Sequence, residues 1–398
     1  MKVIISGAGI VGLLIAQNLK IRGIDYVILD RDTNENARGQ GWGITLHWAL
    51  QTFLDLLPSD VLREKVFKAQ VFPDFDKKDT GTFKYINAAN GETVVSIPPA
   101  RRLRVRREEI RRILLTGLDV NWDCQTVKVE YTDIDVTVHC ADGRSFTGDI
   151  LFGCEGSDSV TRKILDPLEG SLARLPIRFV GSTCKMNKQE YDFVAAKYDP
   201  LLFQGTIPST ETFFWFSLLA SPNYTKAENE YWCQVNLSWK CDFEKESFKT
   251  QEEIKECVID RTRDISPDLK FLVNKMVSND FENGAGLMKE LKLADWPKVS
   301  WKGSDRILLA GDAAHAMTMY RGEAANHGIT DVAVFFTLFD DFLNDRMAWS
   351  ALSSTYHDMI HERCAPAVKL SHQACLDAHD MTKIFTNSSS PLLSSRKL

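Results

Sequence analysis

The chain opens with a pattern in which short apolar runs alternate with apolar positions at helical spacing. Residues 3–5 are apolar and predict a strand, and residues 10–22 carry apolar positions at helical spacing until Gly23. Residues 26–30, Tyr-Val-Ile-Leu-Asp, predict a second strand that ends in an acidic residue. A strand, a helix and a strand in this order predict the start of an α/β domain.

Further apolar runs predict how the chain continues. Residues 150–152 and 307–310 are short apolar strands, and a turn containing glycine and then a predicted helix follow each of them. Residues 212–219 and 231–239 are rich in aromatic residues and alternate or run apolar, which is typical of strands in a sheet. Residues 340–385 predict helices.

The turn after the first strand carries glycines in the pattern GxGxxG. Gly7 permits a tight turn, Gly9 lets backbone amides approach a phosphate, and Gly12 lets the helix pack closely on the strand. The helix N-terminus adds partial positive charge, and Asp30 is placed to accept hydrogen bonds from a ribose. The unit predicts a dinucleotide site, which could hold either NAD or FAD.

Charge and composition exclude several classes of function. The 398 residues carry 48 basic and 54 acidic side chains, a net charge of −6, so no overall field attracts nucleic acid or an anionic membrane. No apolar run approaches the roughly 18–20 residues of a membrane span. The arginine-rich residues 101–112 are the local exception, and they predict an extended segment that leads into a solvated helix face.

Nine cysteines are scattered along the chain without a CxxC pair. Their odd number, and an apolar strand that begins at Val3 in place of a signal peptide, predict reduced thiols and a cytoplasmic protein without a metal site. Residues 388–398 end in Arg-Lys-Leu, which only approximates a peroxisomal address, and we expect a frayed tail.

Three motifs carry a specific resemblance. They are GAGIVG, GCEGSDSVTR and GDAAHAMTMYRGEAANHG, in this order along the chain. Together they resemble the signatures of class A flavoprotein monooxygenases, the aromatic hydroxylases. Within that family, the sequences of the motifs are similar to those of fungal secondary-metabolite monooxygenases. The resemblance implies an α/β fold: a Rossmann-like FAD-binding domain, an inserted and mostly antiparallel β-sheet substrate lobe, and C-terminal helices. It places the FAD-binding domain at residues 1–70, 100–178 and 282–345, the substrate lobe at 71–99 and 179–281, and the C-terminal helices and tail at 346–398.

The resemblance also assigns residues to the cofactor. In the family, the aspartate at position 312 binds a ribityl hydroxyl of FAD, and a helix beginning around residues 322–326 directs its free N–H groups at the pyrimidine edge of the flavin. The implied FAD-binding residues are Gly7, Gly9, Gly12, Asp30, Arg31, Arg38, Gly43, Arg107, Gly311, Asp312, Gly322, Ala324, Ala325 and Asn326.

The implied chemistry needs NAD(P)H, O2 and a small-molecule substrate. NAD(P)H would reduce FAD and leave, since the sequence has no second nucleotide-binding motif, and O2 would add to give a flavin C4a-hydroperoxide. The distal oxygen would hydroxylate or epoxidise an apolar, aromatic or polycyclic compound. Arg321 and His47 are the catalytic candidates, whereas His315 is expected to be a packed, hydrogen-bonded residue. The protein is expected to be a monomer or a homodimer.

The sequence departs from the family pattern at three positions. Glu155 stands where the family has aspartate, Met319 where it commonly has proline, and Ala324 where it commonly has glycine. Alanine at 324 is unfavourable only if the backbone there has a positive φ, and favourable if the segment is already helical. Two alternatives therefore stay open: a flavoprotein of this fold that acts as an oxidase or as a cyclisation or rearrangement catalyst, and a non-enzymatic FAD-fold binder.

Overall fold

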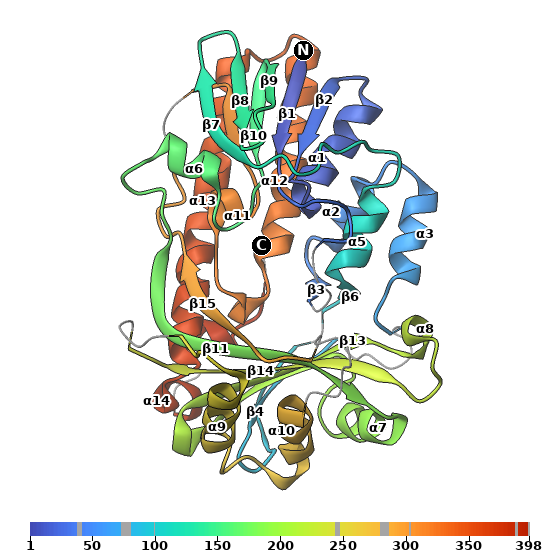
Figure 1. Cartoon of the computed structure of the whole chain (residues 1–398), viewed down its shortest axis with the longest axis vertical. Coiled ribbons are helices and arrows are strands. Elements are labelled where there is room, and N and C mark those ends of the chain that lie inside the picture. Colours follow the sequence, from blue (N-terminus) through green and yellow to red (C-terminus); the bar gives the residue numbers. More distant parts are fainter. Residues whose placement is uncertain are drawn as a thin grey trace.

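The computed structural model describes residues 1–37, 42–72, 81–98, 100–242, 247–278, 286–301, 304–386 and 389–396. Two lobes stack along the long axis of the molecule (Figure 1). One lobe is built on a four-stranded parallel sheet and the other on a seven-stranded sheet. Arg38, one of the predicted cofactor residues, lies outside the described residues.

The parallel sheet has the strand order β16-β10-β1-β2. Its strands are β1 (Lys2–Ser6), β2 (Asp25–Leu29), β10 (Ile150–Gly153) and β16 (Ile307–Leu309). Side chains alternate between the two faces: Val3 and Ile5 join the core under the helices, and Ile4 joins a second core. Because all four strands are parallel, their carboxyl ends meet at one edge, where ligands of such folds bind.

Helices cover one face of this sheet and a small sheet packs on the other. The helices of this lobe are α1 (Ile10–Ile21), α2 (Leu50–Asp55), α3 (Asp60–Lys68), α5 (Arg107–Leu114), α6 (Val160–Leu165), α11 (Asp312–His315) and α12 (Ala324–Leu343). The small antiparallel sheet consists of β7 (Thr126–Tyr131), β8 (Val136–Cys140) and β9 (Ser145–Gly148).

The seven-stranded sheet has the order β15-β11-β14-β13-β12-β4-β5 and is antiparallel except between β12 and β4. Its strands are β4 (Phe83–Asn87), β5 (Thr93–Ile97), β11 (Ala173–Met186), β12 (Leu202–Ile207), β13 (Thr212–Ala220), β14 (Tyr231–Lys240) and β15 (Lys289–Asp295). Along β13, Phe214 and Phe216 face one core, and Phe213 and Trp215 face another.

Three helices cover the face of this sheet that points away from the parallel sheet (Figure 1), and they are α7 (Lys188–Lys197), α9 (Gln251–Arg261) and α10 (Pro267–Ser278). The short helices α8 (Pro222–Thr225), η1 (Pro208–Thr210) and α14 (Met381–Phe385) complete this lobe. Helix α13 (Trp349–Asp377) runs along both lobes in Figure 1. The strand pair β3 (Gly43–Leu46) and β6 (Leu103–Arg106) lies between the lobes, where it contacts β13.

The predicted α/β class, with a Rossmann-like lobe and a mostly antiparallel sheet lobe, is confirmed. The domain boundaries stay a prediction. Two expectations are wrong. Cys124 and Cys140 form a disulfide between neighbouring strand ends, so not every thiol is reduced. Residues 389–396 are not frayed: they include the 3-10 helix η3 (Pro391–Leu393), in which Leu392 and Leu393 are buried. Within the described ranges, every helix is too short or too polar to cross a membrane.

Candidate functional site

The GxGxxG turn lies at the carboxyl edge of the parallel sheet, and its three glycines differ in what surrounds them. At Gly7, where φ is +111°, an added Cβ would lie 2.3 Å from the carbonyl oxygen of Cys154. At Gly12 it would lie 2.0 Å from the carbonyl oxygen of Gly7, so helix and turn are too close for a side chain. At Gly9 it would meet no atom within 4 Å. Gly9 therefore borders open space at the N-terminus of α1, which no side chain caps, and this cradle fits a pyrophosphate.

Beside this cradle, Asp30 is 2% exposed. Its carboxylate accepts hydrogen bonds from the amides of Ala8, at 2.6 Å, and Asp32, at 2.9 Å. A cleft lined by Asp30, Arg31 and Thr126 opens next to it, and Glu155 from the second motif also lines this cleft. Glu155 accepts from the hydroxyl of Ser159 at 2.6 Å and from that of Thr161, so its longer side chain still ties the turn to α6. The cleft fits the adenosine end of a dinucleotide.

The third motif places a second carboxylate at the same edge. Gly311 has a φ of +63°, and an added Cβ would lie 2.9 Å from Val11 of α1, so the turn requires glycine. Asp312 follows it with an exposed side chain, and Arg107, which begins α5, is exposed as well. The surrounding protein raises the pKa of Asp312, and the charges of His315 and Arg107 oppose that shift. Arg107 is thus close enough to Asp312 to act on its carboxylate, and the assignment of Gly311, Asp312 and Arg107 to the cofactor stays a prediction.

A buried charge network holds this turn in place. His315 is fully buried, as expected, and its Nε2 lies 2.8 Å from Oδ2 of Asp331, which also accepts from the amide of Gly311 at 2.7 Å. Arg363 pairs with the other oxygen of Asp331. Burial alone would raise the pKa of Asp331, but His315 and Arg363 together lower it. Burial alone would lower the pKa of His315, but Cys364 and Asp331 raise it well above its ordinary value.

The helix predicted around residues 322–326 begins at Ala324. Gly322 has a φ of +66°, whereas Ala324 and Ala325 lie in the first turn of α12, so alanine there carries no backbone strain. No side chain caps the helix, which leaves N–H groups for a ligand. Asn326 is fully buried; its Oδ1 accepts from the amide of His47 at 3.0 Å, and its Nδ2 donates to the carbonyl of Thr45 at 3.1 Å.

The last predicted cofactor residue, Gly43, opens β3. An added Cβ would lie 2.4 Å from Nη2 of Arg104, so strand and guanidinium are in close contact. The described candidates thus line the carboxyl edge from the GxGxxG turn, past Asp312, to the start of α12. The residues present fit FAD: the cleft beside Asp30 fits its adenosine, the turn at Gly9 its pyrophosphate, Asp312 its ribityl chain, and the start of α12 its ring. Their individual roles stay predictions.

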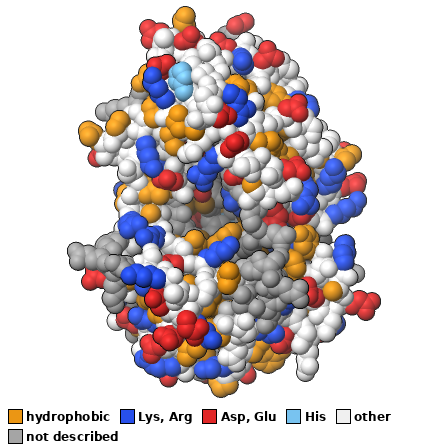
Figure 2. All heavy atoms as spheres, viewed as in Figure 1, with side chains coloured by type: hydrophobic (Ala, Val, Ile, Leu, Met, Phe, Trp, Pro, Cys, Tyr) orange, Lys and Arg blue, Asp and Glu red, His pale blue; other side chains and the backbone are white. Residues whose placement is uncertain are grey.

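A cavity of about 440 Å³ lies beyond the start of α12 and is lined from both lobes. Figure 2 shows the molecule hollowed at mid-height on the face it presents. Among the cavity's uncharged lining residues are Thr45, Trp48, Phe83, Ile97, Leu202, Gln204, Trp215, Met319, Tyr320 and Gly322. Met319, which departs from the family pattern, is therefore a residue of the cavity wall. Among the described lining residues, Trp215 is the only aromatic residue from β13.

Both catalytic candidates line this cavity. Burial lowers the pKa of His47 to about 4, against the hydrogen bond with the carbonyl of Gly322, while Arg396 and Arg321 lower it further. His47 is therefore neutral near pH 7. Arg321 is less free than a catalytic role suggests, because its Nε donates to Glu323 at 2.6 Å and its Nη1 to Ser394 at 2.9 Å.

Sequence reasoning found Arg321 but missed the other arginines of the cavity wall. The expected extended segment includes β6; its Arg102, Arg104 and Arg106 are 5%, 2% and 3% exposed, and Arg102 and Arg104 line the cavity. Their alternation with Leu103 and Val105 is the period-two signal of a strand with two different faces, and it could have located them. Arg396, also in the wall, gave no such signal because it lies in the segment expected to fray.

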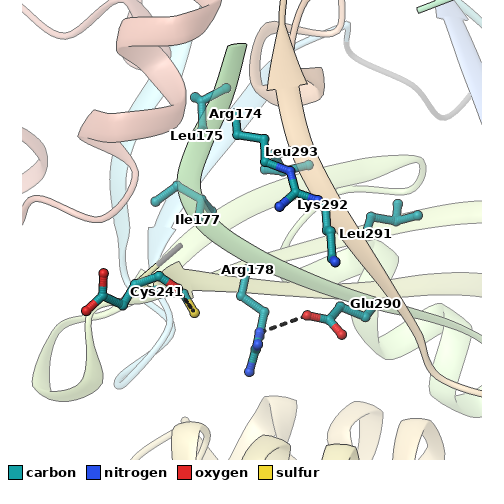
Figure 3. A pocket seen from close by; sticks show the side chains of 10 residues that line it. Arg174, Leu175, Ile177, Arg178, Cys241, Glu290, Leu291, Lys292 and Leu293 are labelled. Atoms are coloured by element: carbon teal, nitrogen blue, oxygen red, sulfur yellow. Dashed lines mark hydrogen bonds and ion pairs between the residues drawn. The ribbon is translucent and has the colours of Figure 1, made fainter. Parts of the chain in front are cut away.

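A second hollow lies at the β11–β15 edge of the large sheet (Figure 3). Arg174, Arg178 and Lys292 give it a basic character, but Arg178 pairs with Glu290 at 2.9 Å. It contains none of the predicted site residues. The cavity at the start of α12, which Gly322 shares with the glycine-rich edge, is the candidate active site.

Comparisons with known proteins identify the family of the chain. The profile of a family described as FAD binding domain matches residues 1–256 and 272–371. The chain is 35% identical, over 99% of its length and 95% of the relative's, to a protein of Arthroderma benhamiae named "Probable FAD-dependent monooxygenase". It is 36% identical, over 84% of its length and 85% of the relative's, to the FAD-dependent monooxygenase dbaB of Emericella nidulans.

Solved structures share the fold. Klebsiella pneumoniae HpxO, in complex with FAD and uric acid, matches with a TM-score of 0.75 at 17% identity, covering 99% of this chain and 92% of that one. The 2,6-dihydroxypyridine-3-hydroxylase of Arthrobacter nicotinovorans matches with a TM-score of 0.75 at 14% identity, covering 99% of this chain and 96% of that one.

Proposed function

Because the chain belongs to the FAD-binding-domain family and is an FAD-dependent monooxygenase, we propose that it uses NAD(P)H and O2 to hydroxylate or epoxidise an aromatic or polycyclic small molecule in secondary-metabolite biosynthesis. The observation that carries the proposal is the continuity of the site. The glycine-rich edge that fits FAD leads to the start of α12, and Gly322 at that point lines the 440 Å³ cavity.

FAD, when bound, would supply the redox chemistry, which is hydride acceptance from NAD(P)H and the activation of O2. The chain supplies position and electrostatics. The amides at the start of α1, beside Gly9, would hold the pyrophosphate, and Asp312 would accept hydrogen bonds from ribityl hydroxyls. The uncapped N–H groups at the start of α12 would stabilise negative charge on the pyrimidine edge.

The cavity wall excludes water and provides one candidate proton acceptor. Leu202, Trp215 and Met319 contribute apolar surface that excludes water from the reacting atoms. His47 is neutral near pH 7, and with its hydrogen on Nε2 it donates to the carbonyl of Gly322 at 3.3 Å. That tautomer leaves Nδ1 as an acceptor for a substrate hydroxyl proton, which would make a phenolic ring more electron-rich. Arg321, tied to Glu323, would position the wall and not exchange protons.

The test is oxygen incorporation by the FAD-loaded protein. A panel of naphthols and hydroxylated anthraquinones would be incubated with NADPH or NADH under 18O2, and the products analysed by mass spectrometry. One 18O atom in a product, with substrate-stimulated NAD(P)H oxidation, supports the proposal. Dehydrogenated or rearranged product without 18O would identify an oxidase or rearrangement catalyst. To widen the substrate search, metabolites of a producing strain with and without the protein would be compared for a compound that gains one oxygen.

A further inference from the structure

The charge of the cavity wall is one-sided. Five arginines line it and the described lining residues include no aspartate or glutamate; the arginines are Arg101, Arg102, Arg104, Arg321 and Arg396. Two of them are neutralised by carboxylates behind the wall. Arg102 pairs with Asp199 at 3.0 Å, and Arg321 pairs with Glu323 at 2.6 Å. The cavity therefore retains positive charge that these internal ion pairs do not cancel.

Of the three other arginines, Arg101 is exposed, Arg104 is buried and Arg396 is half-buried. Its hydrogen bonds within the described chain go to backbone carbonyls: those of Ser394 at 2.6 Å, Leu392 at 3.0 Å and Arg321 at 3.4 Å. Its guanidinium also lies over the ring of Phe83, 4.9 Å from the centroid. Burial and the neighbouring Arg321 lower the pKa of Arg396 to about 10, so it remains a cation near pH 7. Carbonyl dipoles orient this charge but do not neutralise it.

The segment that carries Arg396 is anchored at several points. The hydroxyl of Ser390 donates to Asp377 at 2.5 Å, and Leu392 and Leu393 are packed in the core on the face of the large sheet that bears Phe213 and Trp215. Arg321 donates to Ser394 at 2.9 Å. A guanidinium held by this many contacts is preorganised, so little side-chain entropy is lost when a ligand binds to it.

We propose that Arg396 determines specificity for substrates that carry an anionic oxygen group, a carboxylate or an enolate, alongside their aromatic skeleton. A partly desolvated cation is stabilised by an anion that enters with the ligand, through charge-assisted hydrogen bonds to the planar guanidinium. The neutral His47 and the apolar residues around it leave no competing acid in the described wall. This inference rests on the proposed function for the identity of the cavity, and it names the substrate class.

The experiment compares matched anionic and neutral probes. 2-Naphthoate and 2-naphthamide have the same shape, and both would be titrated into the FAD-loaded enzyme, with binding followed by the change in flavin absorbance and by calorimetry. 4-Hydroxycoumarin, which ionises to an enolate, and neutral coumarin form the second pair and distinguish the two anion sources. We expect at least one anion to bind about tenfold or more tighter than its neutral partner, as a charge-assisted hydrogen bond requires.

Variants assign that preference to Arg396. Arg396→Gln is expected to abolish the preference by weakening the anion about tenfold while leaving the neutral probe unchanged, and Arg396→Lys is expected to retain part of it. Arg346→Gln is the matched control, because Arg346 is an exposed arginine whose side chain pairs with Asp341 far from the cavity wall, and it should bind both probes as the natural protein does.

Three outcomes overturn the proposal: equal binding of anion and neutral partner by the natural protein, no binding of either anion, or an anion preference that survives in Arg396→Gln. If Arg396→Gln does not fold, Arg396→Ala takes its place, and an anion preference that is unaltered in folded Arg396→Ala overturns the proposal. The natural protein needs no variant for its part of the test, because equal binding of anion and neutral partner overturns the proposal by itself. The titrations need neither NAD(P)H nor O2. An anion preference without 18O incorporation would refute the proposed function alone, and 18O incorporation without an anion preference would refute this inference alone.

Discussion

Asp331 is the residue whose replacement most directly tests how the Gly311 turn is held. Its carboxylate is fully buried and has three partners: His315 at 2.8 Å, the amide of Gly311 at 2.7 Å, and Arg363. Asp331→Asn keeps the shape and some of the hydrogen bonds but removes the charge, leaving two cationic side chains without their counter-ion. Removing one partner of a buried ion pair costs about 3–5 kcal/mol, so we expect a loss of that size in the free energy of unfolding.

The loss should depend on pH in a defined direction. His315 and Arg363 hold the pKa of Asp331 below its unfolded value, so its stabilisation is present above about pH 4 and is lost as the pH falls through the folded pKa. Cys364 and Asp331 raise the pKa of His315, so its contribution is complete below about pH 6.5 and is lost as the pH rises through the raised value. The difference between natural protein and variant should therefore be large at pH 6 and shrink in acid.

Urea unfolding of the FAD-free protein, followed by tryptophan fluorescence at pH 6 and pH 3, measures this difference. Asp341→Asn is the matched control, since Asp341 lies on the same helix but forms an exposed pair with Arg346, and exposed pairs contribute at most about 1 kcal/mol. A loss below about 1 kcal/mol at pH 6 for Asp331→Asn, or a loss that stays constant in acid, would refute the reasoning.

Three further predictions concern the cofactor edge and the cavity. Asp312→Ala should weaken FAD binding by about 1.5–3 kcal/mol, seen as release of fluorescent flavin on dilution, and an unchanged affinity would remove Asp312 from the site. Gly9→Ala should fold normally but bind FAD more weakly, because its Cβ enters the open space that would hold the cofactor. Gly12→Ala should instead lose stability, by about 1–3 kcal/mol or more, because its Cβ would lie 2.0 Å from a carbonyl oxygen. Circular dichroism measures the stability and FAD titration the affinity, and equal behaviour of the two variants would contradict the geometry. With a substrate that passes the 18O2 test, turnover should fall as the pH drops through about 4, where His47 becomes protonated, and His47→Gln should lower the rate and abolish that acid limb; an acid limb that persists in the variant would exclude His47 as the base.

The cofactor side of the site could be predicted from sequence because local geometry dictates its residues. A tight turn, a close helix–strand contact and a helix N-terminus each need glycine or a small residue at a fixed spacing, so Gly7, Gly12 and Gly311 are recognisable in the sequence alone. The same logic resolves the departure at Ala324, because a residue inside the first helical turn has no need of glycine's positive φ.

The substrate side could not be predicted in the same way, because its wall is assembled from side chains far apart in the sequence. Arg102 reaches Asp199 and Arg321 reaches Ser394, and no local pattern encodes either contact. Charged residues in a run normally indicate solvent, but at β6 they are buried, because Leu103 and Val105 pack in the core of the parallel-sheet lobe while Arg104 donates to the carbonyl of Leu218 in the large sheet.

The same separation explains how a fold of this kind can keep its cofactor while its substrate changes. The residues that fit FAD belong to turns whose backbone geometry tolerates few substitutions, as the close contacts at Gly7 and Gly12 show. The cavity wall instead draws on the large sheet, through Trp215, and on the segment that carries Arg396, whose Leu392 and Leu393 belong with Trp215 to a core separate from that of the parallel sheet. A substitution at Arg396 can therefore alter which molecule is bound without disturbing the carboxyl edge, and for that reason the substrate class must be tested at the wall and not at the glycine motifs.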